Sequence, residues 1–117
     1  DIYKPLVTFS IDKIKKHYPE LMKYPSRCKL IHGSGRMGYP KKSKKKLYDA
    51  IHVGAASNNV PMHLLNQLKY EGILVIPLRL HKNEQIQTFC KITKTKDDEL
   101  VIEGNEKVRY VPLLKIK

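Results

Sequence analysis

The sequence is poor in the residues that build large cores, disulfide frameworks and membrane anchors. It has no tryptophan, two phenylalanines and two cysteines among its 117 residues. Cys28 and Cys90 stand far apart with no paired spacing, which excludes a disulfide framework and a cysteine-based zinc site; free thiols favour a cytoplasmic location. No apolar run approaches the roughly 18 residues of a membrane-spanning helix, and residues 1–5 do not resemble a secretory signal. We therefore expect one domain, or part of one, with a modest core.

Acidic residues are also scarce, and the resulting basic excess is local. There are 11 acidic residues against 23 lysines and arginines, which gives a formal net charge of +12. Residues 1–46 hold 13 basic and 3 acidic side chains, whereas residues 47–117 hold 10 and 8. This distribution indicates one basic segment on an otherwise ordinary domain rather than a uniformly basic surface.

The hydrophobic pattern predicts an α/β protein. Apolar periodicity and flanking prolines predict helices over residues 5–18 and 61–69. Short apolar runs bounded by turn residues predict strands over residues 28–32, 47–54 and 73–78, of which the last two are typical of strands covered on both faces. A β-rich tail follows, with predicted antiparallel strands at residues 86–93, 100–102 and 108–116 and predicted turns at residues 96–98 and 104–105. Strands that alternate with helices favour a layered α/β sheet, to which the tail adds antiparallel strands at one edge.

Residues 33–38 spell a literal G-x-G-x-x-G after a predicted strand. In a dinucleotide-binding fold such glycines let the backbone approach a pyrophosphate at the start of a helix. Here Tyr39, Pro40 and a lysine run follow instead of a helix, and the acidic residue expected about 20 positions later is missing. An ordinary loop is the better interpretation.

The run from Lys41 to Lys46 contains five lysines in six residues. Such a run can bind phosphates or act as a nuclear address. No aromatic side chain is interleaved to stack on bases, so a solvated, mobile connector is favoured.

No self-contained catalytic or metal-binding motif is visible. The five histidines show no H-E-x-x-H pattern, so we expect no metal site. The acidic cluster Asp97–Glu99 is best interpreted as a solvated turn. No Ser/His/Asp or Cys/His arrangement follows from the spacings, so we assign no catalytic residue.

Residues 48–56 read Y-D-A-I-H-V-G-A-A. This stretch resembles a near-signature segment of the protein-L-isoaspartate (D-aspartate) O-methyltransferase family. Further blocks resemble the same family in the same order, at residues 1–7, 33–39, 60–61, 67–77 and 108–113.

The resemblance implies a Rossmann-like S-adenosylmethionine-dependent methyltransferase fold. Its sheet is mostly parallel, with antiparallel strands at the carboxyl-terminal end and an order of 3-2-1-4-5-7-6. Residues 1–117 would form the carboxyl-terminal part of a single methyltransferase domain, without the amino-terminal half that carries the cofactor loop. Such a fragment would be incomplete and inactive alone, and its missing half or another chain would complete the sheet.

The resemblance also implies two sets of site residues. Asp1 matches the acid that binds the cofactor ribose, and Ile2 stands where the family usually has His. Ser34 and Gly35 match an Asp-Gly pair that holds the adenine, with Ser in place of Asp. The residues implied to line the substrate peptide are His52, Gly54, Ala55, Ala56, Val111 and Leu114. Further departures from the family are Tyr70 and Glu71 in place of Pro-Gly, and Arg79 in place of Gly.

The implied function is the repair of damaged proteins. A methyl group would move from S-adenosylmethionine to the α-carboxylate of L-isoaspartyl or D-aspartyl residues, with isoaspartyl proteins and peptides as partners. Under this interpretation we expect neither a membrane nor a nucleic-acid partner. Two alternatives remain: a basic nucleic-acid-binding module that uses Lys41–Lys46, and a degenerate, noncatalytic remnant.

Overall fold

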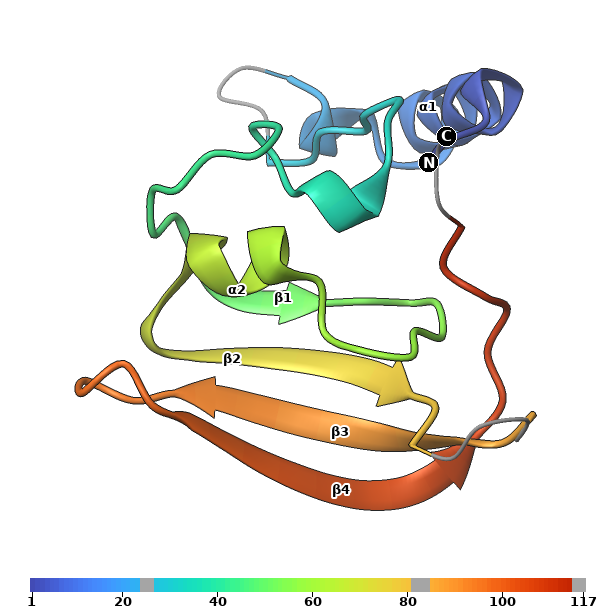
Figure 1. The fold of residues 1–117 in the computed structure, drawn as a ribbon. Helices are drawn as coiled ribbons and strands as arrows, with labels where there is room; N and C mark the ends of the chain where they lie inside the picture. The colour runs from blue at the N-terminus through green and yellow to red at the C-terminus, as the bar shows by residue number, and fades with distance from the viewer. Residues whose placement is uncertain (24–26, 81–84, 115–117) are drawn as a thin grey trace. The chain divides into compact units, whose positions relative to one another are not determined.

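A computed structural model describes residues 1–23, 27–80 and 85–114 (Figure 1). The chain divides into two compact units, which we call the N-terminal unit (residues 1–35) and the sheet unit (the described residues from 36 to 114). No helix in these described ranges is long and apolar enough to cross a membrane.

The N-terminal unit is built on the predicted first helix, α1 (Lys4–His17). Pro5 lies in its first turn, where a missing N–H group costs nothing. Lys15, Lys16 and His17 occupy the last turn, where positive charge complements the helix dipole. A short 3-10 helix, η1 (Pro19–Leu21), follows. Val7 is buried on α1. Leu6 is half exposed and Phe9 is more than half exposed.

The predicted strand at residues 28–32 is wrong, because these residues form no strand. Asp1 and Ile2 lie alongside the end of this segment. The amino group of Asp1 donates to the carbonyl of Ile31 at 2.9 Å, and the N–H of Gly33 donates to the carbonyl of Asp1 at 2.8 Å. Two backbone bonds to a single residue do not form the repeating ladder of a strand.

The sheet unit contains a four-stranded mixed sheet in the order β1-β2-β3-β4 (Figure 1). The strands are β1 (Tyr48–His52), β2 (Leu68–Leu78), β3 (Gln87–Lys94) and β4 (Leu100–Val108). β1 and β2 are parallel, and the two following pairs are antiparallel. This arrangement confirms an α/β fold with antiparallel strands at its carboxyl-terminal end, but the described sheet is mostly antiparallel rather than mostly parallel.

The strand order implied by the resemblance is wrong at one edge. The last strand does not lie between its two predecessors; instead β3 pairs with β2, and β4 is outermost. Burial explains the order. Ile92 and Cys90 on β3 are buried opposite Leu74 and Ile76 on β2, whereas Ile102 on β4 is 57% exposed. The strand with the better apolar alternation takes the inner position.

Burial of β1 also differs from the prediction. Asp49, Ala50 and His52 are exposed, although the run was expected to be covered on both faces. β1 is at the edge of the described sheet and pairs only with β2. The core lies beyond it, where Leu64 of the next helix packs against β2 and β3.

Three boundaries moved relative to the sequence prediction. The second helix, α2 (Met62–Gln67), is shorter because Leu68 already has extended backbone angles and begins β2. The predicted turn at residues 104–105 lies inside β4, where Gly104 is opposite Cys90. β4 ends at Val108, so the separate strand predicted over residues 108–116 does not form among residues 109–114, where Pro112 makes only an isolated bridge. Residues 115–116 lie outside the described residues. The turn predicted at residues 96–98 is confirmed.

Candidate cofactor and substrate sites

In the N-terminal unit, the fold brings the predicted cofactor residues together. Asp1 is held between Ile31 and Gly33 by the two backbone bonds described above. The ring Nε2 of His32 lies 3.0 Å from the carbonyl oxygen of Ile2. These contacts place Asp1 and Ile2 beside the start of the Ser34–Gly35 pair, which is more than 30 positions away in sequence.

The side chains of this cluster suit a polar ligand. The Asp1 carboxylate is exposed, and its Oδ1 accepts the Tyr3 backbone N–H at 2.9 Å, which orients it at the start of α1. The Ser34 hydroxyl is buried and has no hydrogen-bond partner among the described residues. A Cβ atom added to Gly35 would meet nothing within 4 Å. A buried hydroxyl without a partner, next to open space, is a place where a ligand can supply the missing hydrogen bond.

In the sheet unit, the two predicted substrate segments pair with each other. The N–H of Ala56 donates to the carbonyl of Val111, and the N–H of Leu113 donates to the carbonyl of Ala56, both at 2.7 Å. Ala56 is buried, and its backbone groups are used within the fold. Its part in the site is therefore to hold residues 111–113 beside the loop that follows β1.

The remaining predicted substrate residues are open to a ligand. His52 and Gly54 are exposed at the carboxyl end of β1, and Ala55 is half-buried. Val111 is 73% exposed and Leu114 is 44% exposed. In sheets with parallel strands, ligands bind at the carboxyl ends of those strands. An exposed apolar pair beside this edge can pack against a peptide.

Sequence reasoning missed a group of polar residues around Ser57. The Nη1 of Arg36 lies 3.4 Å from the Ser57 hydroxyl, and the backbone N–H of Arg79 donates to the Ser57 carbonyl at 2.9 Å. The buried Nε of Arg79 has no hydrogen-bond partner in the described part of the chain. Ser57 thus contacts the side chain of one arginine and the backbone of another, which no spacing in the sequence indicated.

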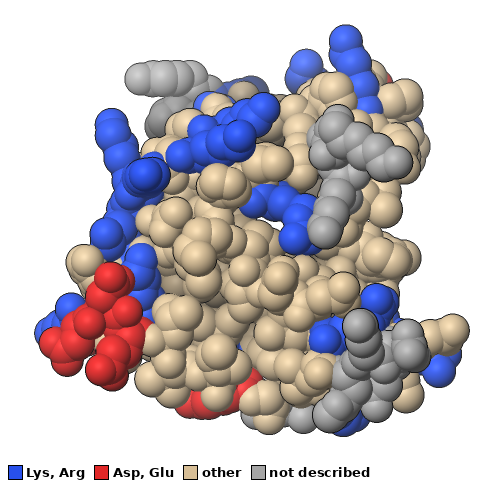
Figure 2. Space-filling view, in the orientation of Figure 1, with Lys and Arg blue, Asp and Glu red and all other residues tan. Residues whose placement is uncertain are grey.

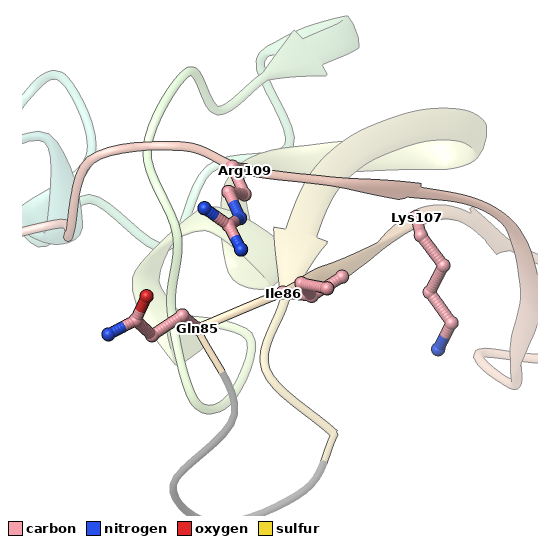
Figure 3. Close-up of a pocket in the computed structure, with 4 residues that line it drawn as sticks. All are labelled: Gln85, Ile86, Lys107 and Arg109. Carbon is pink, nitrogen blue, oxygen red and sulfur yellow. The ribbon is translucent and has the colours of Figure 1, made fainter.

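A second missed feature is a cavity of about 290 Å³ lined by Gln85, Ile86, Lys107 and Arg109 (Figure 3). Arg109 and Gln85 lie on one side of Ile86, and Lys107 lies on the other. Two cations around an apolar floor suit a peptide that bears a carboxylate.

The walls of this cavity are held by a buried side chain. Gln87 donates to the Gln85 carbonyl at 2.6 Å and accepts the Tyr110 N–H at 2.7 Å. The sequence did hold a signal for this role: Gln87 is a polar residue on the buried face of a strand with alternating burial.

The structure is thus an α/β fold with one parallel and two antiparallel strand pairs, and it carries two clusters of candidate site residues. The family model for protein-L-isoaspartate(D-aspartate) O-methyltransferase (PCMT) matches residues 1–117, so the chain belongs to this family.

Individual relatives agree with this assignment. Protein-L-isoaspartate O-methyltransferase 2 of Arabidopsis thaliana is 38% identical over 108 residues, which cover 92% of this chain and 33% of that protein. The Caenorhabditis elegans protein-L-isoaspartate O-methyltransferase is 37% identical over 110 residues, with 92% and 45% covered. The chain thus spans a third to under a half of the length of these curated relatives.

A solved structure shares the fold. It is the crystal structure of a putative protein-L-isoaspartate O-methyltransferase from Plasmodium falciparum in complex with S-adenosyl-L-homocysteine. The TM-score is 0.79 at 30% sequence identity, and the match covers 99% of this chain and 51% of that one.

Proposed function

We propose that the chain is part of a repair enzyme that methylates the α-carboxylate of L-isoaspartyl and D-aspartyl residues in damaged proteins. The observation that carries this proposal is the family match along residues 1–117. We place these residues in the carboxyl-terminal part of a single methyltransferase domain. The amino-terminal half with the cofactor loop, or another chain, would pair with the open edge of β1.

The proposed cofactor is S-adenosylmethionine, and the N-terminal unit has residues that fit it. The Plasmodium falciparum protein is in complex with S-adenosyl-L-homocysteine, which is what remains of this cofactor after it has given up its methyl group. Asp1 would accept hydrogen bonds from the ribose hydroxyls, and the Ser34 hydroxyl and Gly35 would contact the adenine, with Ile2 beside them. The cofactor supplies an activated methyl group on a sulfonium.

The substrate carboxylate needs no base. Carboxyl groups are already ionised at pH 7, so the protein has to position the acceptor and exclude water rather than move a proton. His52, Gly54, Ala55, Val111 and Leu114 would line the peptide, and Ala56 would hold the two segments together. We place the protein in the cytoplasm, a reducing compartment that suits the free, buried thiol of Cys90.

The test is the transfer of a labelled methyl group from S-adenosylmethionine to an isoaspartyl peptide. It belongs on the complete polypeptide that carries this chain, and the same peptide with ordinary aspartate is the control. We expect label on the isoaspartyl peptide alone, and none with the isolated 117-residue chain. Cofactor binding without any transfer would favour the degenerate remnant.

The Ser34→Asp variant tests the proposed contact between residue 34 and the adenine, independently of methyl transfer. A carboxylate accepts hydrogen bonds more strongly than a hydroxyl, so we expect roughly tenfold tighter cofactor binding. Binding measured by calorimetry that is unchanged in this variant would place the adenine elsewhere.

A further inference from the structure

The lysine-rich segment is an ordered loop, contrary to the mobile connector favoured by the sequence. We call residues 38–47 the lysine loop. It is held by the side chain of Gln67, which is fully buried. Gln67 accepts the Tyr39 N–H at 2.9 Å and donates to the carbonyls of Pro40 and Ser43 at 2.9 and 3.1 Å.

Contacts within the loop and at its ends complete this order. The N–H of Lys42 donates to the Met37 carbonyl at 2.8 Å, and the N–H of Leu47 donates to the Gln67 carbonyl at 2.8 Å. Gly38 has φ +70°, and a Cβ there would lie 2.4 Å from the Gln67 amide, so glycine is required. The lysines are thus displayed from a fixed backbone, which lowers the entropy lost when a partner binds.

The lysines of the loop have no ion-pair partner among the described residues. Lys41, Lys42, Lys44, Lys45 and Lys46 are all exposed. Nearby carboxylates pair with other lysines: Asp49 with Lys69, Asp98 with Lys94, and Glu71 with Lys96. None of the ion pairs found among the described residues includes a lysine of the loop. Figure 2 shows basic side chains at the left edge of the view, where the chain enters β1.

The lysine loop lies at the opposite end of β1 from the proposed substrate residues. It enters β1 at Tyr48, whereas His52 and Gly54 stand at the strand's carboxyl end (Figure 1). A strand of five residues is about 17 Å long at roughly 3.3 Å per residue. A flexible polypeptide spans that distance with about ten residues. One damaged, unfolded protein can therefore occupy both places at once.

Resting on the proposed function, we infer that the lysine loop is a second docking surface for the substrate, which binds acidic segments of the damaged polypeptide. The residue types favour a polypeptide over a nucleic acid. The loop has no arginine for bidentate phosphate contacts. The Tyr70 ring near it is already contacted by Lys46 at 4.8 Å and Lys94 at 5.5 Å, rather than open for base stacking. Docking there raises the local concentration of the linked isoaspartyl site.

Binding tests this inference without any catalysis. We would measure fluorescence anisotropy of a peptide with a run of glutamates, and of the same peptide with glutamines, against the whole 117-residue chain. The loop variant replaces Lys41, Lys42, Lys44 and Lys45 by glutamine. The matched control makes the same change in charge on α1, at Lys4, Lys13, Lys15 and Lys16. We expect the glutamate peptide to bind, and to bind roughly tenfold more weakly to the loop variant alone.

Each other outcome overturns the inference. An equal loss in both variants would show a general effect of net charge. A single-stranded oligonucleotide that binds the loop more tightly than the glutamate peptide would assign it to nucleic acid. Circular dichroism confirms that both variants fold.

The inference and the proposed function can fail separately. In one outcome, the complete enzyme transfers methyl groups to a neutral isoaspartyl peptide and shows no lower KM when a distant acidic run is added to that peptide. That result would contradict the docking surface and leave the enzymatic proposal standing. Binding of the glutamate peptide that depends on the lysine loop, without any methyl transfer by the complete enzyme, would contradict the enzymatic proposal alone.

Discussion

At the scale of single residues, Gln67 links α2 to the segment before β1. Its side chain makes three hydrogen bonds to the backbone of residues 39–43 from a fully buried position. Leucine has a similar size and cannot make any of them. The Tyr39 N–H and the two carbonyls would then be left without partners, and each buried unpaired group costs about 1–3 kcal/mol.

We therefore expect Gln67→Leu to lower the free energy of unfolding by about 2–4 kcal/mol, measured by urea denaturation. The neighbouring Asn66→Leu is the control, because Asn66 is only half-buried and makes none of these bonds. A Gln67→Leu protein as stable as the Asn66→Leu protein would contradict the anchoring role.

The fold changes the titration of the Cys90 thiol. Burial raises the pKa of its thiol, and the charge of Lys107 offsets part of that rise. In the unfolded chain the thiol has its ordinary pKa near 8.5. The stability contributed by the neutral thiol is therefore complete below about pH 8.5, and is lost as the pH rises through the higher pKa of the folded protein.

The measurement is the free energy of unfolding at pH 8 and at pH 10. We expect a larger decrease for the wild type than for Cys90→Val, which has no thiol to titrate at this position. If Cys90→Val loses as much stability as the wild type between the two pH values, the buried thiol is not the cause.

At the scale of elements, Lys94 joins the end of α2 to the hairpin of β3 and β4. Its Nζ donates to the carbonyls of Leu65 and Leu68 at 3.0 and 3.4 Å and lies 3.8 Å from the Asp98 carboxylate. Only 8% of its side chain is exposed. A buried ammonium that binds the last carbonyls of a helix satisfies groups that the helix itself leaves unpaired.

We expect Lys94→Met to cost about 2 kcal/mol of stability, because the apolar stem is kept and the donor is lost. Lys96→Met removes only a surface pair with Glu71, so its effect should stay below about 0.5 kcal/mol. The midpoints of thermal unfolding, measured for the two variants under the same conditions, should therefore differ. Equal midpoints would mean that Lys94 does not cap α2.

The two helices, the turn at residues 96–98 and the locations of the four strands were predictable from the sequence, whereas the strand predicted at residues 28–32 and the turn predicted at residues 104–105 were wrong. α1 and the turn between β3 and β4 depend on residues close in the chain, so periodicity and turn residues identified them. Residues 28–32 had the pattern of a strand and failed to form one, since a strand also needs a partner elsewhere in the chain.

At the scale of the whole molecule, the chain leaves apolar surface uncovered. Tyr3, Leu6 and Phe9 on or beside α1 are about half exposed, as are Val101 and Ile102 on the outer strand β4. β1 also has an edge with no partner among the described strands. Uncovered apolar side chains and open strand edges drive association.

We expect the isolated 117-residue chain to associate as its concentration rises. Sedimentation velocity across a dilution series should show species larger than the 13.6 kDa monomer. High salt screens the repulsion between positively charged chains and should increase the association. A single monomeric species at every concentration and salt level would contradict this expectation.

The sequence by itself determined the family and the two helices, because these depend on local order along the chain; the site residues that it indicated stay predictions. Only the tertiary structure decided which strands pair and that β1 lies at the edge of the described sheet. It also decided that the backbone groups of Ala56 form hydrogen bonds with residues 111–113. It also decided that the lysine loop is held in place. Gln67 lies 24 to 28 positions from the loop residues that its side chain binds, and a buried amide reveals its partners only when the chain has folded around it.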